Sequence, residues 1–558
     1  MKIWHSKKFF WEMAKNNGVC LLAFLLGGGV FIAVYGIYVL NPQNVRWLIY
    51  EGEDLAQHYL GWVGYRNSDW FFPLGMTNQL CYPLKTSIIF TDSIPLLAVV
   101  FKMFRFLLPE EFQYFGLWGL GCYCLTGAIS AKILQKFLKS DFMIVVGSFF
   151  FVTSFQMFQR MYAHTALAGH WIILLAILLC VYHDTKFSTT KAQMKAWIAM
   201  GILASSIHIY LLLMCGIILL GFLFSEYLQT KDIKKILCIL FGYIMSAFLT
   251  IYLLGGFSLG TMSDMGGLAA YSLNLNGLFN PMGLSALWTG LPYREGQLEG
   301  FAYVGMGVIL LLSAGGISCI YRCVVRKEKV LALKDRRIVI GIAGANFIAV
   351  IFALSPAVTY GNRVLFEWNI FPILQRIWGT FRATGRVAWI SVYCLMLLGI
   401  LLTVRLRPVW FGKTLLLCCC IIQLTDVSAL MQQKHVQFAF DKDYDLHLNG
   451  EAWDKLLTDV SLAHWVIVSD IQWETDWPDF RYIAVKALEA HKTLNRFHMA
   501  RSMEPKLEEI RQELQTPATD TVYIWKESDT QNCPNIGLNL YEVDGFIVGT
   551  VKPLRENP

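Results

Sequence analysis

Residues 18–40, GVCLLAFLLGGGVFIAVYGIYVL, form a long apolar run that contains no charged side chain. About 20 apolar residues suffice for a helix to cross the hydrocarbon core of a bilayer, so this run predicts a transmembrane helix. Similar runs recur over most of the chain. The sequence therefore predicts an α-helical polytopic membrane protein with about eleven transmembrane helices, at residues 18–40, 112–134, 142–161, 166–183, 194–208, 209–226, 236–255, 301–321, 338–355, 387–404 and 413–431.

The composition agrees with this prediction. Of the 558 residues, 56% are hydrophobic and only 16% are charged, whereas roughly a quarter of the residues in a soluble domain are charged. These values exclude an ordinary soluble enzyme. The first apolar run lacks a small-residue cleavage site and ends in the bulky stretch from Tyr35 to Leu40, so we expect a retained anchor and not a cleaved signal peptide.

Basic residues are distributed unevenly along the chain. Residues before 433 carry a net charge of +15, and those from 433 onwards carry −8. If the N-terminus is cytoplasmic, 23 of the 34 Lys and Arg residues of the membrane part fall in short inner loops, as the positive-inside rule requires. We therefore expect an N-in, C-out topology with the acidic tail outside.

One apolar segment does not fit a spanning helix. Residues 93–108, SIPLLAVVFKMFRFLL, are too short to cross the membrane and carry Lys102 and Arg105. With Ser93 as the N-cap and Pro95 in the first turn, the segment predicts an amphipathic helix that lies in the outer interface.

The chain divides into two predicted domains. Residues 1–432 form a transmembrane domain with three polar outer loops, at 41–111, 256–300 and 356–386. Residues 433–558 predict a small extracytoplasmic α/β domain, which we interpret as a lid or an acceptor-docking module. Its strands are expected in HWVIVSD, DTVYIWKES and LNLYEVDGFIVG, and its helices at 450–458, 478–490 and 503–515.

Cysteine use indicates packing more than chemistry. Twelve of the 14 cysteines lie in the apolar runs or, for Cys323, two residues beyond one, where a thiol behaves as a small hydrophobe. Cys81 and Cys533 lie outside them, and whether they form a disulfide stays open. The cysteines show no zinc-type spacing.

The first outer loop concentrates acidic residues. In EGEDLAQHYLGW, Glu51, Glu53 and Asp54 crowd the start of a predicted surface helix, and His58 follows Asp54 one turn later. Such carboxylates can cap a helix and complement its dipole. The alternative is a general base, with a divalent ion held by a carboxylate and His58.

Two further polar clusters fall on the same predicted face. His164 and His170 bracket a short loop in MYAHTALAGHW, and each is either a polar anchor at the interface or a functional group. His208 is expected to be a helix-end residue. In REGQLEGFAYVG, Gln297 and Glu299, with Glu295, offer groups suited to sugar hydroxyls, although an inert ordered loop is the alternative.

Arginines precede a late spanning helix on the outer side. Arg376, Arg382 and Arg386 lie in ILQRIWGTFRATGRVAW, against the positive-inside bias. Guanidinium groups bind phosphate oxygens in a bidentate manner, and anchoring to lipid headgroups is the alternative. Carboxylates, arginines and apolar walls together suit a substrate with a phosphate and a long lipid tail.

Several blocks together resemble a bacterial family of uncharacterised polytopic membrane proteins. These blocks are EGEDLAQHYLGW, the run from WFFPLG to TDSIPLL, FQYFGLW, NPMG with GQLEGFAYVG, and TFRATGRVAW. The layout of a first helix, a long acidic outer loop, interfacial helices and a helical bundle also resembles the GT-C superfamily of glycosyltransferases.

The GT-C resemblance implies sugar transfer from a polyprenyl-phosphate-linked donor to a glycan, lipid or protein acceptor at the outer face of the bacterial cytoplasmic membrane. Asp54, or its neighbour Glu53, matches the position of the catalytic base, and Arg382 and Arg386 would neutralise the departing phosphate. A Mg or Mn ion, if one is bound, would be held by Glu53 and Asp54. The expected substrate-binding residues are His58, Asp92, His164, His170, Gln297, Glu299, Arg382 and Arg386.

Two other functions stay open at this point. A transporter or flippase of lipid-linked glycans would need ionisable groups within the spans, where the sequence has few. A non-enzymatic scaffold or sensor is the third reading. Membrane lipids are expected partners in each case, and no nucleic-acid partner is expected.

Overall fold

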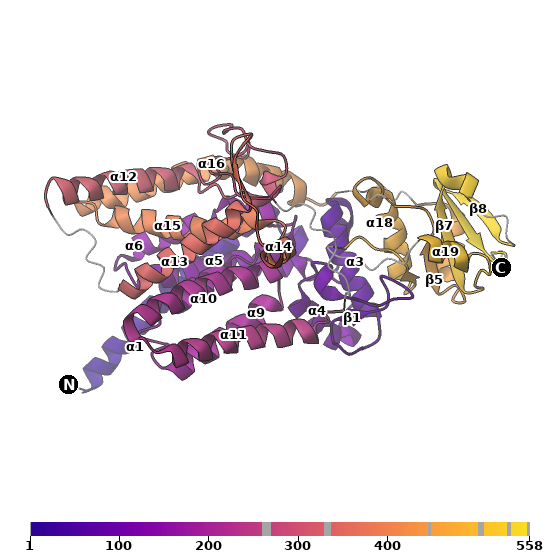
Figure 1. The fold of residues 1–558 in the computed structure, drawn as a ribbon, viewed down its shortest axis with the longest axis horizontal. Helices are drawn as coiled ribbons and strands as arrows, with labels where there is room; N and C mark the ends of the chain where they lie inside the picture. Colours follow the sequence, from indigo (N-terminus) through magenta and orange to yellow (C-terminus); the bar gives the residue numbers. More distant parts are fainter. Residues whose placement is uncertain are drawn as a thin grey trace.

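The computed structural model describes residues 2–258, 269–327, 336–442, 444, 448–471, 473–499, 507–532 and 537–554. Within these ranges, the side chains of residues 2–16, 53, 336, 373–374, 376–377, 473–475, 477–478, 507 and 530–532 are outside the description. Figure 1 shows an elongated molecule, with a helical bundle at the N-terminal end and a small sheet domain at the other.

Long apolar helices form the bundle. Within the described ranges, nine are long and apolar enough to cross a membrane. They are carried by α1 (Lys2–Tyr35), α5 (Phe115–Gln135), α6 (Asp141–Val152) with α7 (Phe155–Arg160), α10 (Ile209–Thr230), α11 (Ile233–Leu253), α12 (Met306–Val324), α13 (Arg336–Leu354), η6 (Thr384–Ala388) with α15 (Trp389–Val404), and α16 (Val409–Phe438).

The remaining two predicted spans are helices that are too short for this criterion. α8 (Trp171–Val181) has 11 residues and α9 (Thr190–Ser205) has 16, so at 1.5 Å per residue neither reaches the roughly 30 Å of a hydrocarbon core. The 3-10 turn η4 (Thr165–Ala168) precedes α8. All eleven predicted runs are therefore helical, and nine of them are long enough to span.

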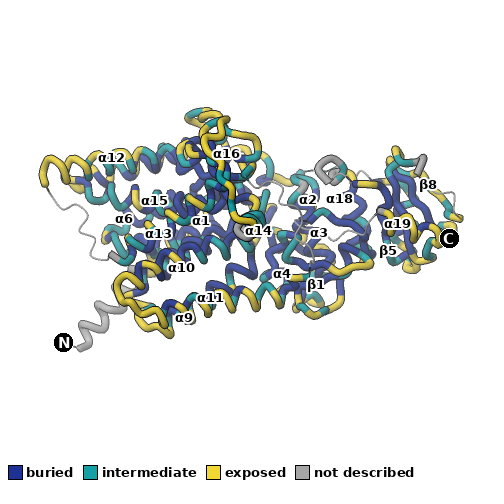
Figure 2. The backbone as a smooth tube through the Cα atoms, in the orientation of Figure 1, coloured by how far each residue is buried: buried dark blue, intermediate teal, exposed yellow. Residues whose placement is uncertain are grey.

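The outer surface of the bundle is apolar. Figure 2 shows exposed stretches along α11 and α12, at the edges of the bundle. Large apolar side chains such as Leu237, Phe241, Phe248 and Ile317 are more than half exposed there. A soluble protein rarely exposes apolar patches of this size, so these faces fit contact with lipid.

The first outer loop folds into a compact layer against one end of the bundle. It contains η1 (Tyr38–Leu40), α2 (Arg46–Tyr50), α3 (Glu53–Asn67), the short strands β1 (Met76–Thr77) and β2 (Thr86–Ser87), η2 (Ile88–Phe90), α4 (Pro95–Met103) and η3 (Arg105–Leu107). α3 is buried along most of its length (Figure 2). The loop is therefore part of the packed structure.

A helix forms in the segment predicted to lie in the interface, but the prediction of its cap is wrong. Ile94, with φ of +52°, occupies the N-cap position of α4, and Pro95 is in the first turn as expected. Ser93 instead donates a hydrogen bond from Oγ to the backbone oxygen of His58, at 2.6 Å. Ser93 thus ties the start of α4 to α3.

The later loops form two smaller elements at the same end of the bundle. η5 (Gln297–Gly300) lies in the loop before α12, and the hairpin of β3 (Ala357–Tyr360) and β4 (Arg363–Glu367) is followed by α14 (Pro372–Thr380). The hairpin is antiparallel, with a register shift between Val358 and Thr359.

The C-terminal part contains a five-stranded mixed sheet in the order β6-β5-β7-β9-β8. β5 (His464–Ile467) is parallel to β6 (Thr493–Leu494) and β7 (Thr521–Lys526), and β9 (Phe546–Thr550) is antiparallel to β7 and β8 (Asn539–Val543). Its helices are α17 (Glu451–Thr458), α18 (Trp473–Glu489) and α19 (Leu507–Glu513), and η7 (Glu527–Asn532) follows β7. A small C-terminal α/β unit is thus confirmed.

The cysteine prediction falls partly outside the described chain. Cys81 is buried, and Cys533 is one of the residues that the structure does not describe. Pairing between them stays a prediction.

Candidate active site

Polar side chains from distant parts of the sequence meet at the end of the bundle that carries the first outer loop. Asp54 and His58 come from the first two turns of α3, and Asp92 lies just before α4. His164 lies between α7 and η4, His208 directly precedes α10, Glu299 lies in η5 and Arg386 in η6. Close polar contacts join these residues into two halves of a cluster, which lie side by side because ligand atoms of His58, Asp92 and His164 are within 4.8 Å of one another.

Asp92 is the centre of one half of the cluster. Its Oδ2 lies 3.2 Å from Nε2 of His58, and its Oδ1 lies 3.6 Å from Nε2 of His208. Burial opposes ionisation of Asp92, but His58, His208 and His164 outweigh it and lower the pKa to about 2. Asp92 is therefore a buried carboxylate anion at neutral pH.

His208 positions this carboxylate. Its Nδ1 accepts the backbone N–H of Tyr210, at 3.2 Å, which caps α10. A neutral imidazole that accepts at Nδ1 carries its proton on Nε2, so Nε2 is a donor toward Asp92. Burial lowers the pKa of His208 to about 4, although Asp92 acts in the opposite direction. The ring is thus neutral at pH 7.

Glu299 is the centre of the other half. Its Oε2 accepts from Nη1 of Arg160, at 3.1 Å, and from Nη2 of Arg386. Burial acts to raise the pKa of Glu299, but His164, Arg160 and Arg386 outweigh it and hold the pKa well below its usual range. One carboxylate therefore balances the charge of two almost buried arginines, Arg160 and Arg386, whose side chains are 3% and 10% exposed.

His164 lies between Glu299 and Asp54, and within 4.8 Å of ligand atoms of His58 and Asp92. Its Nδ1 lies 3.6 Å from Oδ2 of Asp54, and its Nε2 lies 3.6 Å from Oε2 of Glu299. Burial and the charge of Arg386 lower the pKa of His164, while Glu299 opposes this shift. The side chain of Asp54 is 41% exposed, so this carboxylate is accessible and lies beside a histidine. Sequence reasoning grouped Asp54 with His164, and the structure brings them together.

Three side chains in the cluster could hold a metal ion. His58, Asp92 and His164 each offer a ligand atom, and these atoms lie within 4.8 Å of one another. Nδ1 of His58 hydrogen-bonds Oγ1 of Thr165, at 3.2 Å, which leaves Nε2 to face Asp92 and an ion. Imidazole ligands suit zinc or iron better than magnesium, which prefers oxygen.

This donor set differs from the predicted pair of Glu53 and Asp54. The side chain of Glu53 is outside the described part of the chain, and Asp54 contacts the cluster through His164. The assignment of an ion to Glu53 and Asp54 stays untested.

Two predicted substrate-binding residues lie away from the cluster. His170 is fully buried, with Nδ1 2.5 Å from the hydroxyl of Tyr393 and its ring against Trp389. Gln297 is also buried, and its amide hydrogen-bonds Asn274, Thr359, Ser272 and the backbone of Arg294. Gln297 thus holds η5 to the β3–β4 hairpin, and its amide is already occupied.

The predicted arginines have different surroundings. Arg386 is held by Glu299, whereas Arg382 is exposed, with its guanidinium 6.0 Å from the ring centroid of Tyr271. The side chain of Arg376 is outside the description. Of the two predicted arginines whose side chains the structure describes, Arg382 is therefore the accessible one.

Sequence reasoning missed part of the cluster. Arg160 was not among the predicted site residues, and His208 was predicted only as a helix-end residue. His208 does cap α10, but it also contacts Asp92. No local motif marks either residue, because each acquires its partner from a loop more than 100 residues away in the chain.

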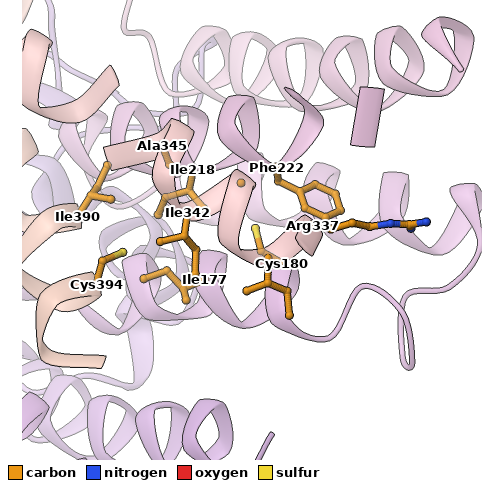
Figure 3. A pocket seen from close by; sticks show the side chains of 11 residues that line it. Ile177, Cys180, Ile218, Phe222, Arg337, Ile342, Ala345, Ile390 and Cys394 are labelled. Carbon is orange, nitrogen blue, oxygen red and sulfur yellow. The ribbon is translucent and has the colours of Figure 1, made fainter. Parts of the chain in front are cut away.

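A narrow apolar pocket lies elsewhere in the bundle, among α8, α10, α13 and α15 (Figure 3). Its lining includes Ile177, Cys180, Phe222, Ile342 and Cys394, and its volume is about 10 Å³. That volume holds about one water molecule. The pocket is a packing gap and not a second substrate site.

Comparisons with known proteins agree with the family resemblance. The family model described as a domain of unknown function, DUF6311, matches residues 24–428, and the model of the DUF6311 C-terminal domain matches residues 452–551. None of the curated proteins compared with the chain matches it.

Among solved structures, the chain is similar to the crystal structure of the Archaeoglobus fulgidus oligosaccharyltransferase in the apo form. The identity is 11%, the match covers 91% of this chain and 70% of that chain, and the TM-score is 0.44. The complex of the same enzyme with Zn and sulfate gives 12% identity, coverage of 91% and 68%, and a TM-score of 0.41. Likenesses at these TM-scores support no functional assignment. The match over residues 24–428 does show the family: the chain belongs to DUF6311, a family of unknown function.

Proposed function

We propose that the protein is a membrane glycosyltransferase that transfers a sugar from a polyprenyl-phosphate-linked donor to an acceptor at the outer membrane face. The observation that carries this proposal is the accessible carboxylate of Asp54, 3.6 Å from His164, within a charged cluster at one end of an apolar helical bundle. An exposed carboxylate that is oriented by a histidine suits proton abstraction from an acceptor hydroxyl.

Asp54 is the proposed general base. Nδ1 of His164 faces its Oδ2, and Nε2 of the same ring faces Glu299, which is fixed by Arg160 and Arg386. His164 can therefore orient the carboxylate while the other oxygen of Asp54 accepts the proton. The acceptor oxygen then attacks the anomeric carbon, and the bond to the lipid phosphate breaks.

Arg382 is the proposed partner of the departing phosphate. Its side chain is exposed, and it lies four residues from Arg386, which is engaged with Glu299. A fixed cation beside the leaving group stabilises the charge that develops there. Arg386 would act indirectly, because it positions Glu299 and, through Glu299, His164.

An apolar groove supports a substrate with a lipid tail. Leu97 and Phe101 of α4 form one wall, and Leu117 and Trp118 of α5, with Trp171 of α8, form the other; its volume is about 210 Å³. Nε1 of Trp118 donates to the backbone oxygen of Thr165, whose hydroxyl contacts His58. The groove thus begins beside the charged cluster, which suits a chain whose phosphate lies at the cluster.

If the reaction uses a divalent ion, His58, Asp92 and His164 would hold it, and one nitrogen of His164 would then face the ion in place of Asp54 or Glu299. Such an ion would neutralise negative charge on the donor phosphates. Nδ1 of His58, bonded to Thr165, fixes the ring so that Nε2 faces the ion, and His208 holds Asp92 from the far side.

The distribution of charge supports an outer location for the site. At the opposite ends of α10, α11 and α13, buried Glu226 pairs with Lys235, at 2.7 Å, and with Arg337, at 3.1 Å. These basic residues belong to the set that the positive-inside rule places in the cytoplasm. The cluster and the C-terminal domain then lie outside.

Two buried carboxylates within the spans do not favour a transport path. Glu226 is held by two cations, and Asp426 accepts hydrogen bonds from Ser285, from Tyr303, at 3.0 Å, and from the backbone of Met306, at 2.6 Å. Both carboxylates are fully buried, and their ion pairs and hydrogen bonds connect separate segments of the bundle.

The proposal is tested by mass spectrometry of lipid-linked sugars and surface glycans in cells with and without the protein. Cells with Asp54→Asn should show the glycan pattern of cells that lack the protein, with the protein still inserted. Asp184→Asn is the matched control, because Asp184 pairs with Lys136 at the surface; it should restore the pattern. Identical patterns with and without the protein would refute the proposal.

A further inference from the structure

One block of the first outer loop takes no part in the proposed site. Residues 70–74, WFFPL, lie between α3 and β1 and begin one of the blocks that carry the family resemblance. The side chain of Phe72 is 69% exposed, and those of Trp70 and Leu74 are also exposed. We call these five residues the aromatic tip. Large apolar side chains gathered on a surface mark a contact with a membrane or another protein, so the tip points to a partner.

The aromatic tip lies at the end of α11. The ring of Phe72 is 6.0 Å from that of Tyr252, which belongs to the last turn of this helix, with an angle of 69° between the planes. Oγ of Ser87 in β2 donates to the backbone oxygen of Leu254, at 2.5 Å. Figure 1 shows β1, which pairs with β2, beside this end of α11. The tip is therefore held against α11, at the end of the bundle that carries the site.

An exposed apolar face of α11 leads to the aromatic tip. It contains Leu237, Phe241, Phe248 and Tyr252, and their spacing of four, seven and four residues places them on one side of an α-helix. A face of this kind on a helix long enough to span fits contact with lipid. Phe72 extends it by one more ring, because that ring packs edge-on against Tyr252. The tip thus continues the side of the bundle that lipid is expected to cover.

Two cations beside the aromatic tip are used inside the loop. Nζ of Lys102, in α4, donates to Oγ of Ser68, at 2.9 Å, and to the backbone oxygen of Asp69, at 3.0 Å. The same ammonium lies 4.8 Å from the ring centroid of Trp70. Nη1 of Arg105, in η3, donates to the backbone oxygen of Ser68, at 2.8 Å. Both cations therefore bind the chain that leads into the tip, and they join α4 and η3 to it.

The side chains that α4 and η3 expose next to the tip include four large apolar ones. Met103, Phe104, Phe106 and Leu107 are about half exposed or more. Lys102 adds no charge to this surface, because its side chain is buried under Trp70 and Tyr65. The apolar surface of the aromatic tip is thus enlarged by that of the neighbouring helix.

We infer that the aromatic tip inserts into the membrane leaflet at this end of the bundle and anchors the first outer loop there. Lipid is the partner that fits, because the tip continues the lipid-facing side of α11, and another protein would have to displace lipid from that side. Trp and Lys favour the headgroup region of a membrane. Besides Trp70, exposed Lys85 lies there, with Nζ 3.7 Å from the ring centroid of Phe71. The inference goes beyond the proposed function and does not depend on sugar transfer.

Photo-cross-linking tests the contact in the full chain. Phe72 is replaced by p-benzoylphenylalanine, and the protein is reconstituted in vesicles of phosphatidylcholine and phosphatidylglycerol. After irradiation, mass spectrometry detects lipid joined to the protein; the excited ketone reacts with C–H bonds, so it reports acyl chains and not water. The same replacement at Phe248, on the exposed face of α11, is the positive control, and Val460, 88% exposed in the C-terminal domain, is the negative control. We expect the lipid-adduct yield at Phe72 to be close to that at Phe248, with none at Val460.

Two results would overturn the inference. One is a lipid-adduct yield at Phe72 no higher than at Val460 while Phe248 gives adducts. The other is cross-linked dimers in place of lipid adducts at Phe72, which would assign the tip to contacts between copies of the chain. If the Phe72 variant does not insert into membranes, the replacement is made at exposed Leu74 in the same tip, where the same results decide.

Discussion

Glu299→Gln is the change that isolates the central charge of the site. Glutamine keeps the size and shape of the side chain but removes the charge that holds Arg160, at 3.1 Å, and Arg386. Both guanidinium groups would stay almost buried and would lose their shared anion. The carbonyl oxygen of the amide still accepts hydrogen bonds, so the effect measures charge compensation and not packing.

The magnitude follows from burial. Removing one partner of a buried ion pair costs ~3–5 kcal/mol, but the Glu299 side chain is 35% exposed, so solvent screening reduces the expected loss. We expect the free energy of unfolding to fall by about 2–3 kcal/mol. His164 also loses its acceptor on Nε2, so Asp54 would be less well oriented and transfer slower.

The assay is thermal denaturation of the purified protein in detergent, together with the rate of sugar transfer. Glu295→Gln is the matched control, because Glu295 lies in the same loop and is exposed. If Glu299→Gln and Glu295→Gln had the same melting temperature and rate, Glu299 would not hold the cluster together, and the reasoning would be refuted.

Three further predictions concern metal, pH and packing. Asp92→Asn should weaken zinc binding by more than about 100-fold in a direct titration, because a charged ligand is lost beside His58; unchanged affinity would place any ion elsewhere. The pKa of His208 is about 4 in the folded protein against its usual 6.5, so the unfolded chain binds more protons between these values, and stability should fall as pH drops from 6.5 towards 4. His208→Asn, which keeps a capping side chain, should flatten that decline in melting temperature; an unaltered decline would contradict the assignment. Gln297→Leu removes the buried amide that bonds Asn274, Thr359 and Ser272, and should lower the free energy of unfolding by about 3 kcal/mol in chemical denaturation while KM stays unchanged; a raised KM with normal stability would instead indicate substrate contact.

Apolar runs predicted the helices well because their signal is local. Each of the eleven predicted runs is helical, and the strands and helices of the tail lie close to where their patterns placed them. Local patterns did not predict interruptions. The 142–161 run breaks after Val152 before α7 begins at Phe155, and α16 continues to Phe438, beyond the predicted end at 431.

The candidate site was predictable in part. Asp54, His58, His164, Glu299 and Arg386 were each predicted from local charge or polarity, and the structure brings them together at one end of the bundle, with contacts that join all but His58 into one network. Their partners were not predictable, because the contacts depend on tertiary packing.

Residues outside that network show the limits of local reasoning. His170 and Gln297 have the same polar chemistry as the site residues but lie buried, with partners in the core. The docking of the C-terminal domain on the first outer loop was also not predictable. It follows from backbone pairing of Leu494 with Gln79 and Tyr82, which no local pattern indicates.

The most direct test of the central claim is sugar transfer by the purified protein in proteoliposomes that contain a polyprenyl-phosphate-linked sugar. The wild-type protein should transfer the sugar to an added acceptor fraction from cell surfaces, and Asp54→Asn should be slower by about 10²- to 10⁴-fold, as expected for loss of a general base. Transfer by Asp54→Asn at the wild-type rate would contradict the account.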